Sequence, residues 1–412
     1  MILKILRVLC GSVALALLVL ATGCVVPPAK PNIDGANAPA SLDQVVSRVV
    51  DDLARQLAAQ DNVMERLARA SGKAPRKSLS FDAFVDGASG QRTALAGDFQ
   101  RRLITRLGAT HPEFQLIPLS ADSLRQTDLL LVGTISLEGA GLDTVVPQGS
   151  PAGVQVSIVS RGKSSVVARA SGRVRNDGLD LTPSRLDQES PVVSLDRYAK
   201  GQARTAAARV GEAADPVYLG GLRAAVSIGA GQDEYEAGRY AEAAKHFSAA
   251  LEDPTGERLL ALNGSYMSSI KQGQFSLAEG YFSRIVKLGL TDRNLNVRFL
   301  FKPGSTDFWP DPQVTGQYDM WIRQISRGIE QAKACVELVG HASHTGPEAL
   351  NNRLSEQRAL VIRQRLQQQM PQLASMLTTK GMGFHKNIIG TGTDDSRDAL
   401  DRRVEFVVGK CG

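Results

Sequence analysis

The most specific pattern in this chain is CVELVGHASHTG at residues 335–346, followed by LNNRLSEQRA at residues 350–359. Apolar residues alternate up to Gly340, which predicts a strand that runs into a loop at His341. The second stretch opens a long helix, on which Leu354 is expected to lie in the core. A strand, a polar loop and a helix therefore follow one another here.

Further elements are predicted on both sides of this pattern. Residues 296–300 indicate a strand, and residues 317–332 form an amphipathic helix by the spacing of their apolar residues. Residues 402–408, RRVEFVV, predict a final strand. The last third of the chain is thus expected to be a β/α/β/α/β domain over residues 291–412.

These motifs closely resemble the OmpA C-terminal-like domain, over about residues 296–409. That family has a strand ending in G-H-x-D-x-x-G, then N-x-x-L-S-x-x-R-A, then N-R-R-V-E. The family binds peptidoglycan through its diaminopimelate peptide, so the resemblance implies the same partner for this chain. The family's ligand positions correspond here to Ser343, Thr345, Gly346, Asn351, Arg358 and Arg403.

The residue types at these positions suit a peptide that carries carboxylates and an ammonium group. A guanidinium presents a planar fork of donors that holds a carboxylate through two bonds, and Arg358 occupies the family's carboxylate-binding position. The amide of Asn351 can bind the ligand or brace the loop, and Ser355 is either a ligand contact or a hydrogen bonder of the helix. Ser343 stands where the family has an aspartate, and Asp401 stands where it has an asparagine. Because a hydroxyl brings no charge, the site is expected to be weakened or retuned.

Two cysteines of this region are expected to form a disulfide. Cys335 starts one predicted strand and Cys411 follows the end of the last one, so the two meet if these strands are antiparallel neighbours. The alternative is a pair of thiols that never meet. The bond also needs an oxidising compartment, such as the periplasm.

The N-terminus indicates that compartment. Lys4 and Arg7 precede an apolar run over residues 8–21, which ends in LATGC with Cys24 as its last residue. This resembles a bacterial lipobox, which implies that residues 1–23 are a lipoprotein signal peptide and that Cys24 is acylated. Val25 is not the aspartate of an inner-membrane retention signal, so we expect an anchor in the outer membrane, facing the periplasm. Residues 24–40 are rich in proline and predict a tether.

A mixed α/β domain is predicted over residues 41–176. Helical spacing at residues 42–57 and 95–107 alternates with strand patterns at residues 79–85, 114–119, 129–137, 154–159 and 165–174. The runs SLSFDAFVDGASGQRTALAGDFQRRLITRL, FQLIPLS and TDLLLVGTI resemble the periplasmic domain of CsgG-type and LpoB-type lipoproteins. This resemblance implies a role in a secretion pore or in activating cell-wall synthesis. The short segment 139–154 argues against a pore-forming hairpin.

A repeat lies between these two domains, over residues 231–290. Gly238, Ala243 and Phe247 recur 35 residues later as Gly273, Ala278 and Phe282. This spacing resembles a pair of tetratricopeptide (TPR) repeats, and an ordinary duplicated helical hairpin is the alternative. Residues 177–230 are expected to supply a linker and capping helices, around residues 198–210 and 217–228.

Composition excludes several classes of function. The net charge is +6 over 412 residues and no long basic block occurs, so nucleic acid is not an expected partner. No G-x-S-x-G, H-E-x-x-H, Walker A or Rossmann motif occurs, so we predict no enzyme and no cofactor. His341 and His344 have no neighbouring acid or cysteine in the sequence, so we predict no metal site.

The sequence thus predicts a lipid-anchored outer-membrane protein that binds peptidoglycan. Its TPR-like and α/β parts would hold or activate a periplasmic or envelope protein partner. The alternative is a component of a secretion or surface-appendage assembly in the outer membrane.

Overall fold

The computed structural model describes residues 38–61, 71, 76–140, 146, 149–193, 195–293, 295–302, 304–310, 312–385 and 401–409, without the side chains of residues 313 and 314. All described elements belong to one structural unit, residues 38–412. The predicted signal peptide, Cys24 and residues 24–37 of the predicted tether lie outside the described residues, as does Cys411.

The first part of the described chain is built on a five-stranded sheet of order β2-β1-β3-β4-β5. β1 is parallel to β2 and β3, whereas β3, β4 and β5 are antiparallel neighbours. The strands predicted at residues 154–159 and 165–174 are confirmed as β4 and β5. The strands are β1 (Lys77–Phe81), β2 (Phe114–Pro118), β3 (Leu129–Leu137), β4 (Ala152–Ser160) and β5 (Ser165–Val174).

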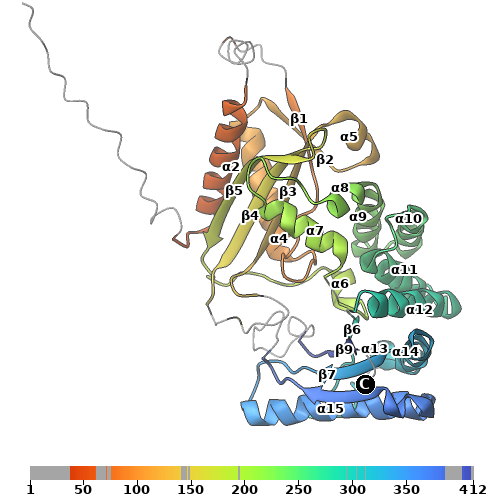
Figure 1. Cartoon of the computed structure of the whole chain (residues 1–412). Helices are drawn as coiled ribbons and strands as arrows, with labels where there is room; N and C mark the ends of the chain where they lie inside the picture. Colours follow the sequence, from red (N-terminus) through yellow and green to blue (C-terminus); the bar gives the residue numbers. More distant parts are fainter. Residues whose placement is uncertain are drawn as a thin grey trace, which may run out of the picture. The chain divides into compact units, whose positions relative to one another are not determined.

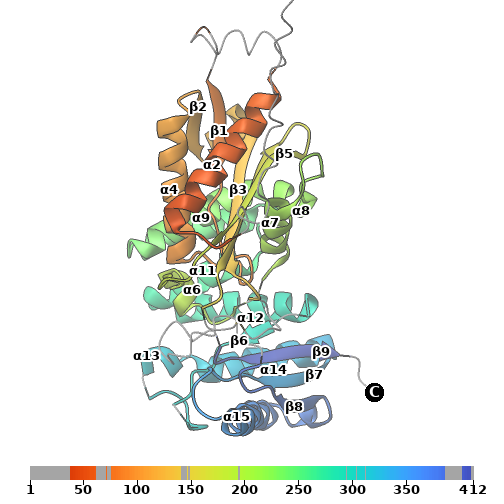
Figure 2. The same ribbon diagram turned by 90° about the vertical axis from the view of Figure 1, so that its left-hand side faces the viewer.

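Helices cover both faces of this sheet (Figure 1). α2 (Leu42–Ala59) and α4 (Ala94–Thr110) bury their apolar stripes against one face, and α5 (Ala121–Gln126) lies near β1. α2 begins with a capping box at Ser41, which satisfies two of its first amide groups. α7 (Arg197–Ala207) packs on β3 and β4 from the opposite side (Figure 2).

A group of helices follows: α6 (Arg185–Glu189), α8 (Pro216–Gly220), α9 (Leu222–Glu236), α10 (Tyr240–Glu252), α11 (Leu259–Lys271) and α12 (Phe275–Thr291). The segment predicted as a capping helix around residues 217–228 is two helices, α8 and α9, divided at Gly221, and α9 packs against α10. A Cβ added at Gly221 would lie 2.7 Å from Cδ2 of the Tyr198 ring, so this ring occupies the space that a side chain at residue 221 would need. The segment around residues 198–210 does not cap the helical stack, because α7 buries Ala206 in the apolar cluster of the sheet.

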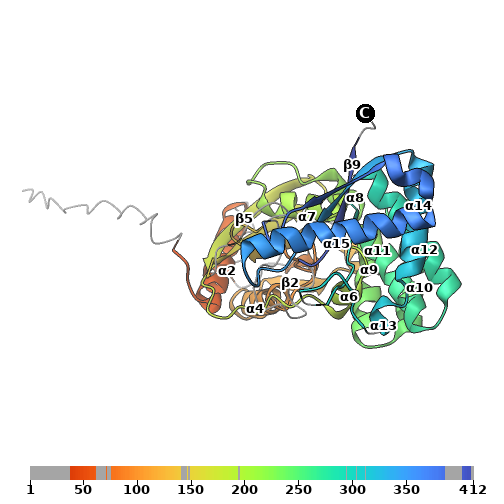
Figure 3. The ribbon, with the colours of Figure 1, turned by 90° about the horizontal axis from the view of Figure 1, so that it is seen from below.

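The C-terminal part is a second sheet of order β6-β9-β7-β8, with β7 antiparallel to β9 and parallel to β8. The predicted strands at residues 296–300 and 402–408 are shifted, and β8 was not predicted. α14 contacts both α12 and α15 (Figure 3). α15 packs on β7 and β8. The elements are β6 (Leu295–Val297), α13 (Pro312–Thr315), α14 (Tyr318–Ala332), β7 (Cys335–Gly340), α15 (Glu348–Gln369), η1 (Pro371–Ser375), β8 (Leu377–Gly381) and β9 (Val404–Gly409).

One apolar core is shared by the helical group and the second sheet. Phe282 of α12 stacks on Trp321 of α14, with ring centroids 5.4 Å apart, and Phe299 meets the same Trp321 edge-on at 5.7 Å. The Trp321 indole Nε1 donates to the Tyr266 hydroxyl of α11 at 2.8 Å. These contacts hold α14, and with it the C-terminal sheet, against the helical group.

Candidate functional site

The first candidate site is the loop over residues 341–346, between β7 and α15. Its first three residues, His341, Ala342 and Ser343, are buried. The amide of His341 donates to the Arg403 carbonyl at 3.0 Å, and the amide of Ala342 donates to the Gly383 carbonyl at 2.8 Å. The loop is therefore fastened at its start to the chain that enters β9 and to the turn after β8.

Gly340 ends β7 against the backbone of α15. A Cβ at this position would lie 2.0 Å from the Ser355 carbonyl oxygen, so only glycine allows the strand and the helix to approach this closely. Ser355 is fully buried; its hydroxyl donates to the Asn352 carbonyl and accepts the amide of Gly383 at 2.8 Å. These contacts of Ser355 join the helix to the turn after β8.

Asn351 braces the loop from the first turn of α15. Its side-chain amide donates to the Thr345 carbonyl at 2.7 Å and approaches the Gly346 carbonyl at 3.4 Å. Gly346 has a φ of +83°, which glycine adopts without strain. The hydroxyls of Ser343 and Thr345 lie 3.5 Å apart. The structure thus brings together Ser343, Thr345, Gly346 and Asn351 around one loop.

Arg358 lies two turns further along α15, and only 3% of it is exposed. Its Nε donates to the Ser305 carbonyl at 3.2 Å, and its Nη2 donates to the Lys302 carbonyl at 3.1 Å. The guanidinium also lies over the ring of Phe301, 5.1 Å from the ring centre. Arg358 is thus held at the segment 301–305, which follows β6.

Sequence reasoning missed this segment as a part of the site. Leu300 is positioned by its amide, which donates to the Tyr318 hydroxyl at 2.8 Å. Burial raises the pKa of Tyr318 to about 12, so the hydroxyl stays neutral. The sequence feature that could have indicated this segment is an aromatic residue, Phe301, shortly before a glycine, Gly304. The φ of Gly304 is +61°.

One further predicted residue, Arg403, precedes β9, and Glu405, which was not predicted, lies within that strand. Arg403 is 2% exposed, so its side chain is buried and its carbonyl holds His341. His341 Nε2 lies 3.2 Å from Oε2 of Glu405, a carboxylate that is 64 residues away in sequence. Among the residues that the structure describes, no group of three or more His, Cys, Asp or Glu side chains forms a metal-binding cluster.

Cys335 opens β7 opposite Gly409, the last residue of β9. The antiparallel pairing on which the disulfide prediction depends is therefore present. The structure records Cys335 as disulfide-bonded. Cys411 lies outside the described residues, so its pairing with Cys335 stays a prediction.

No described helix is both long enough and apolar enough to cross a membrane.

The C-terminal part of this chain is similar to a known protein family. Residues 300–400 match the model of the OmpA family, so the C-terminal part of this chain is an OmpA-like domain. The outer membrane protein Omp38, from two strains of Acinetobacter baumannii, is 30% identical over 114 residues. That alignment covers 27% of this chain and 30% of Omp38, so the chain matches less than a third of its relative's length.

Solved structures that are similar to part of this chain come from several bacteria. An outer membrane protein of Borrelia burgdorferi is 25% identical, with 28% of this chain and 88% of that one covered and a TM-score of 0.22. The peptidoglycan-associated lipoprotein of Burkholderia pseudomallei is 20% identical, with 28% and 89% covered and a TM-score of 0.24. The cell wall anchor of the T6SS of Pseudomonas aeruginosa is 18% identical, with 31% and 97% covered and a TM-score of 0.24.

Proposed function

We propose that this chain binds peptidoglycan through its OmpA-like domain, without catalysing a reaction. The observation that carries the proposal is the buried guanidinium of Arg358, at the family's carboxylate-binding position and within a region that matches the OmpA family model. The ligand would be the stem peptide, whose diaminopimelate has carboxylates for an arginine fork.

The loop at Ser343 supplies the other half of the proposed site. Its hydroxyl accepts a hydrogen bond from the ligand's ammonium, in place of the carboxylate that the family uses. A charge-assisted hydrogen bond is about twice as strong as a neutral one, so we expect weaker binding than in relatives with the aspartate. Asn351 contributes by holding the loop in shape through the Thr345 carbonyl.

Sedimentation with purified sacculi tests the proposal. Wild type is expected to sediment with sacculi, and Arg358→Ala is expected to bind about tenfold more weakly or worse, because a bond to a charged group is lost. Ser343→Asp is expected to bind more tightly. The matched control is Arg353→Ala, which removes an exposed arginine from the same helix and should leave binding unchanged.

Thermal unfolding of each variant separates binding from folding. Arg358 also holds two backbone carbonyls, so Arg358→Ala is expected to lower the unfolding temperature, whereas Ser343→Asp changes binding in a folded protein. If wild type and Ser343→Asp both fail to sediment with sacculi, the proposed function is wrong.

The remaining parts of the chain would place this domain between membrane and wall. We propose that acylated Cys24 anchors it in the outer membrane and that residues 24–40 act as a tether. The TPR-like and α/β parts would then hold an envelope protein partner. Phe275 and Leu277, at the start of α12, are about half exposed and provide an apolar contact for such a partner. Co-purification with a penicillin-binding protein would support activation of cell-wall synthesis.

A further inference from the structure

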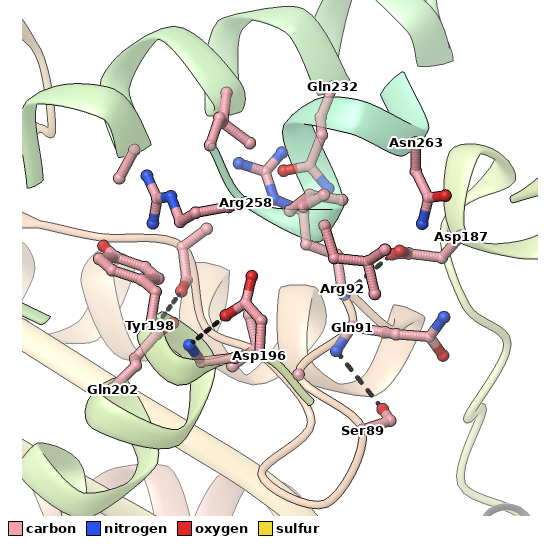
Figure 4. Close-up of a pocket in the computed structure, with 18 of the residues that line it drawn as sticks. Ser89, Gln91, Arg92, Asp187, Asp196, Tyr198, Gln202, Gln232, Arg258 and Asn263 are labelled. Atoms are coloured by element: carbon pink, nitrogen blue, oxygen red, sulfur yellow. Dashed lines mark hydrogen bonds between the residues drawn. The ribbon is translucent and has the colours of Figure 1, made fainter. Parts of the chain in front are cut away.

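A polar cavity lies where the first sheet's connecting loops meet the helical group (Figure 4). Its volume is about 90 Å³. Its wall is formed by the loop before α4, by α6 and the start of α7, and by α9 and α11. The polar side chains of the wall that carry the argument are Gln91, Asp187, Gln232, Arg258 and Asn263.

Four of these side chains are more than nine-tenths buried and each leaves one polar atom without a hydrogen bond. Within the described part of the chain, no partner exists for Gln91 Oε1, Gln232 Nε2, Arg258 Nε and Asn263 Oδ1. Their exposed fractions are 6%, 3%, 8% and 4%. Buried polar groups are nearly always hydrogen-bonded, so four unsatisfied atoms around one cavity point to a polar ligand.

The unsatisfied atoms are of two kinds. Arg258 Nε and Gln232 Nε2 are donors, whereas Asn263 Oδ1 and Gln91 Oε1 are acceptors. Figure 4 shows Arg258 beside Tyr198 on one side of the cavity and Asn263, Asp187 and Gln91 on the other, with Gln232 between them. Donors suit a carboxylate and acceptors suit an ammonium group.

Two charged side chains of the wall, Arg258 and Asp187, lie among these unsatisfied atoms, and Arg92 and Asp196 also line the cavity. Arg258 donates from Nη2 to the Gly221 carbonyl and stacks on Tyr198 at 3.9 Å, and among the described residues no ion pair includes it. Asp187 accepts the Ser184 hydroxyl and the Arg92 amide. Burial raises the pKa of Asp187 to about 6, although the hydrogen bonds from Ser184 and Arg92 and the charge of Arg92 oppose the shift.

We propose that this cavity binds a small zwitterion of the size of glycine or alanine. Its carboxylate would face Arg258 and Gln232, and its ammonium would face Asn263, Gln91 and Asp187. The size follows from the volume, because a cavity of about 150 Å³ is enough for a ligand of the size of benzene. This site is separate from the proposed wall-binding loop and does not depend on it.

Calorimetric titration of the purified full chain tests this proposal. The probes are glycine, L-alanine and D-alanine, with acetate and methylammonium as half-molecules and leucine as an oversized amino acid. We expect saturable binding of glycine or of an alanine, at least about tenfold weaker binding of each half-molecule, and no binding of leucine.

Variants locate the site. Gln232→Met removes a donor that has no partner within the described structure, so it should weaken binding about tenfold while the ligand-free protein unfolds at the same temperature or higher. Arg258→Met should abolish binding. Arg223→Met, on the same helix as Gln232, removes an exposed arginine and should leave binding unchanged.

Three results would overturn the proposal. Absence of saturable binding by glycine and both alanines would mean that the cavity holds water alone. Acetate that binds as tightly as glycine would mean an anion site without a partner for the ammonium. Binding that survives in both folded variants, Gln232→Met and Arg258→Met, would mean that the ligand sits elsewhere. Sacculus binding by Gln232→Met should equal that of wild type in every case.

Discussion

Asp82 joins three elements through a single buried carboxylate. Its Oδ2 accepts the hydroxyls of Tyr198 at 3.1 Å and Tyr218 at 3.0 Å, and its Oδ1 accepts the Ala83 amide. Burial raises the pKa of Asp82, and the tyrosine hydrogen bonds oppose that shift. Because the tyrosines belong to α7 and α8, this carboxylate holds both helices at the end of β1.

Asp187, on α6, makes the stability of the protein depend on pH. Burial raises its folded-state pKa from 3.8 to about 6, while hydrogen bonds from Ser184 and Arg92 act against the shift. The folded state therefore binds a proton more tightly than the unfolded state between these values. The free energy of unfolding should fall by about 3 kcal/mol as pH rises from below 4 to above 6.

Asp187→Asn checks this expectation. The amide keeps an acceptor for Ser184 and cannot ionise, so the variant should lose that part of the pH dependence and be more stable than wild type at pH 7. Unfolding curves at pH 4, 5, 6 and 7 measure the effect. Asp177→Asn, which changes an exposed carboxylate, should follow the wild-type profile. Equal profiles for wild type and Asp187→Asn would contradict the prediction.

The helices of the repeat region pack around Phe247 of α10, which is fully buried. A Cβ added at Gly264 of α11 would lie 2.3 Å from Cζ of Phe247. A Cβ added at Gly231 of α9 would lie 2.8 Å from Cε1 of the same ring. Glycine at both positions lets three helices share a single ring. The recurrence of Phe247 and Phe282 therefore marks the groove-filling residues of this region, and its membership of the TPR class remains a proposal.

A pair of glycine substitutions measures this packing. Gly264→Ala should lower the free energy of unfolding by about 1–3 kcal/mol, since the ring has no space to yield. Gly280→Ala, inside α12 with no atom within 4 Å of the added Cβ, should raise it by about 0.5–1 kcal/mol through helix propensity. Chemical denaturation of both variants gives the comparison. If both are stabilised, α11 does not approach Phe247 this closely.

The proposed anchor in the outer membrane is a property of the whole molecule. Cys24 and Cys10 provide a test variant and a matched control for it. Cys24→Ser should abolish lipid labelling and remove the protein from the outer-membrane fraction, because each buried methylene of an acyl chain contributes about 0.8 kcal/mol to membrane binding. Cys10→Ser changes a cysteine inside the predicted signal peptide and should leave fractionation unchanged. Outer-membrane fractionation of Cys24→Ser equal to that of wild type would exclude the proposed anchor.

Local patterns were sufficient to predict much of the C-terminal part. The helical spacing of apolar residues predicted α14, and the motif around Gly340 predicted the passage from β7 into a loop and α15. The departure at Ser343 is also visible in the sequence alone. These features are readable because they depend on residues within one strand, one turn or a few helical turns of each other.

The positions that no local pattern marks are those made by distant segments. Arg358 meets Lys302 and Ser305 more than 50 residues away in sequence, and Gln91 shares a cavity with Asn263 across 172 residues. Each of these side chains looks like an ordinary polar residue in its own segment. Their roles arise only when the segment after β6 lies against α15 and the helical group packs on the first sheet, because burial and contacts between distant segments are properties of the packed chain.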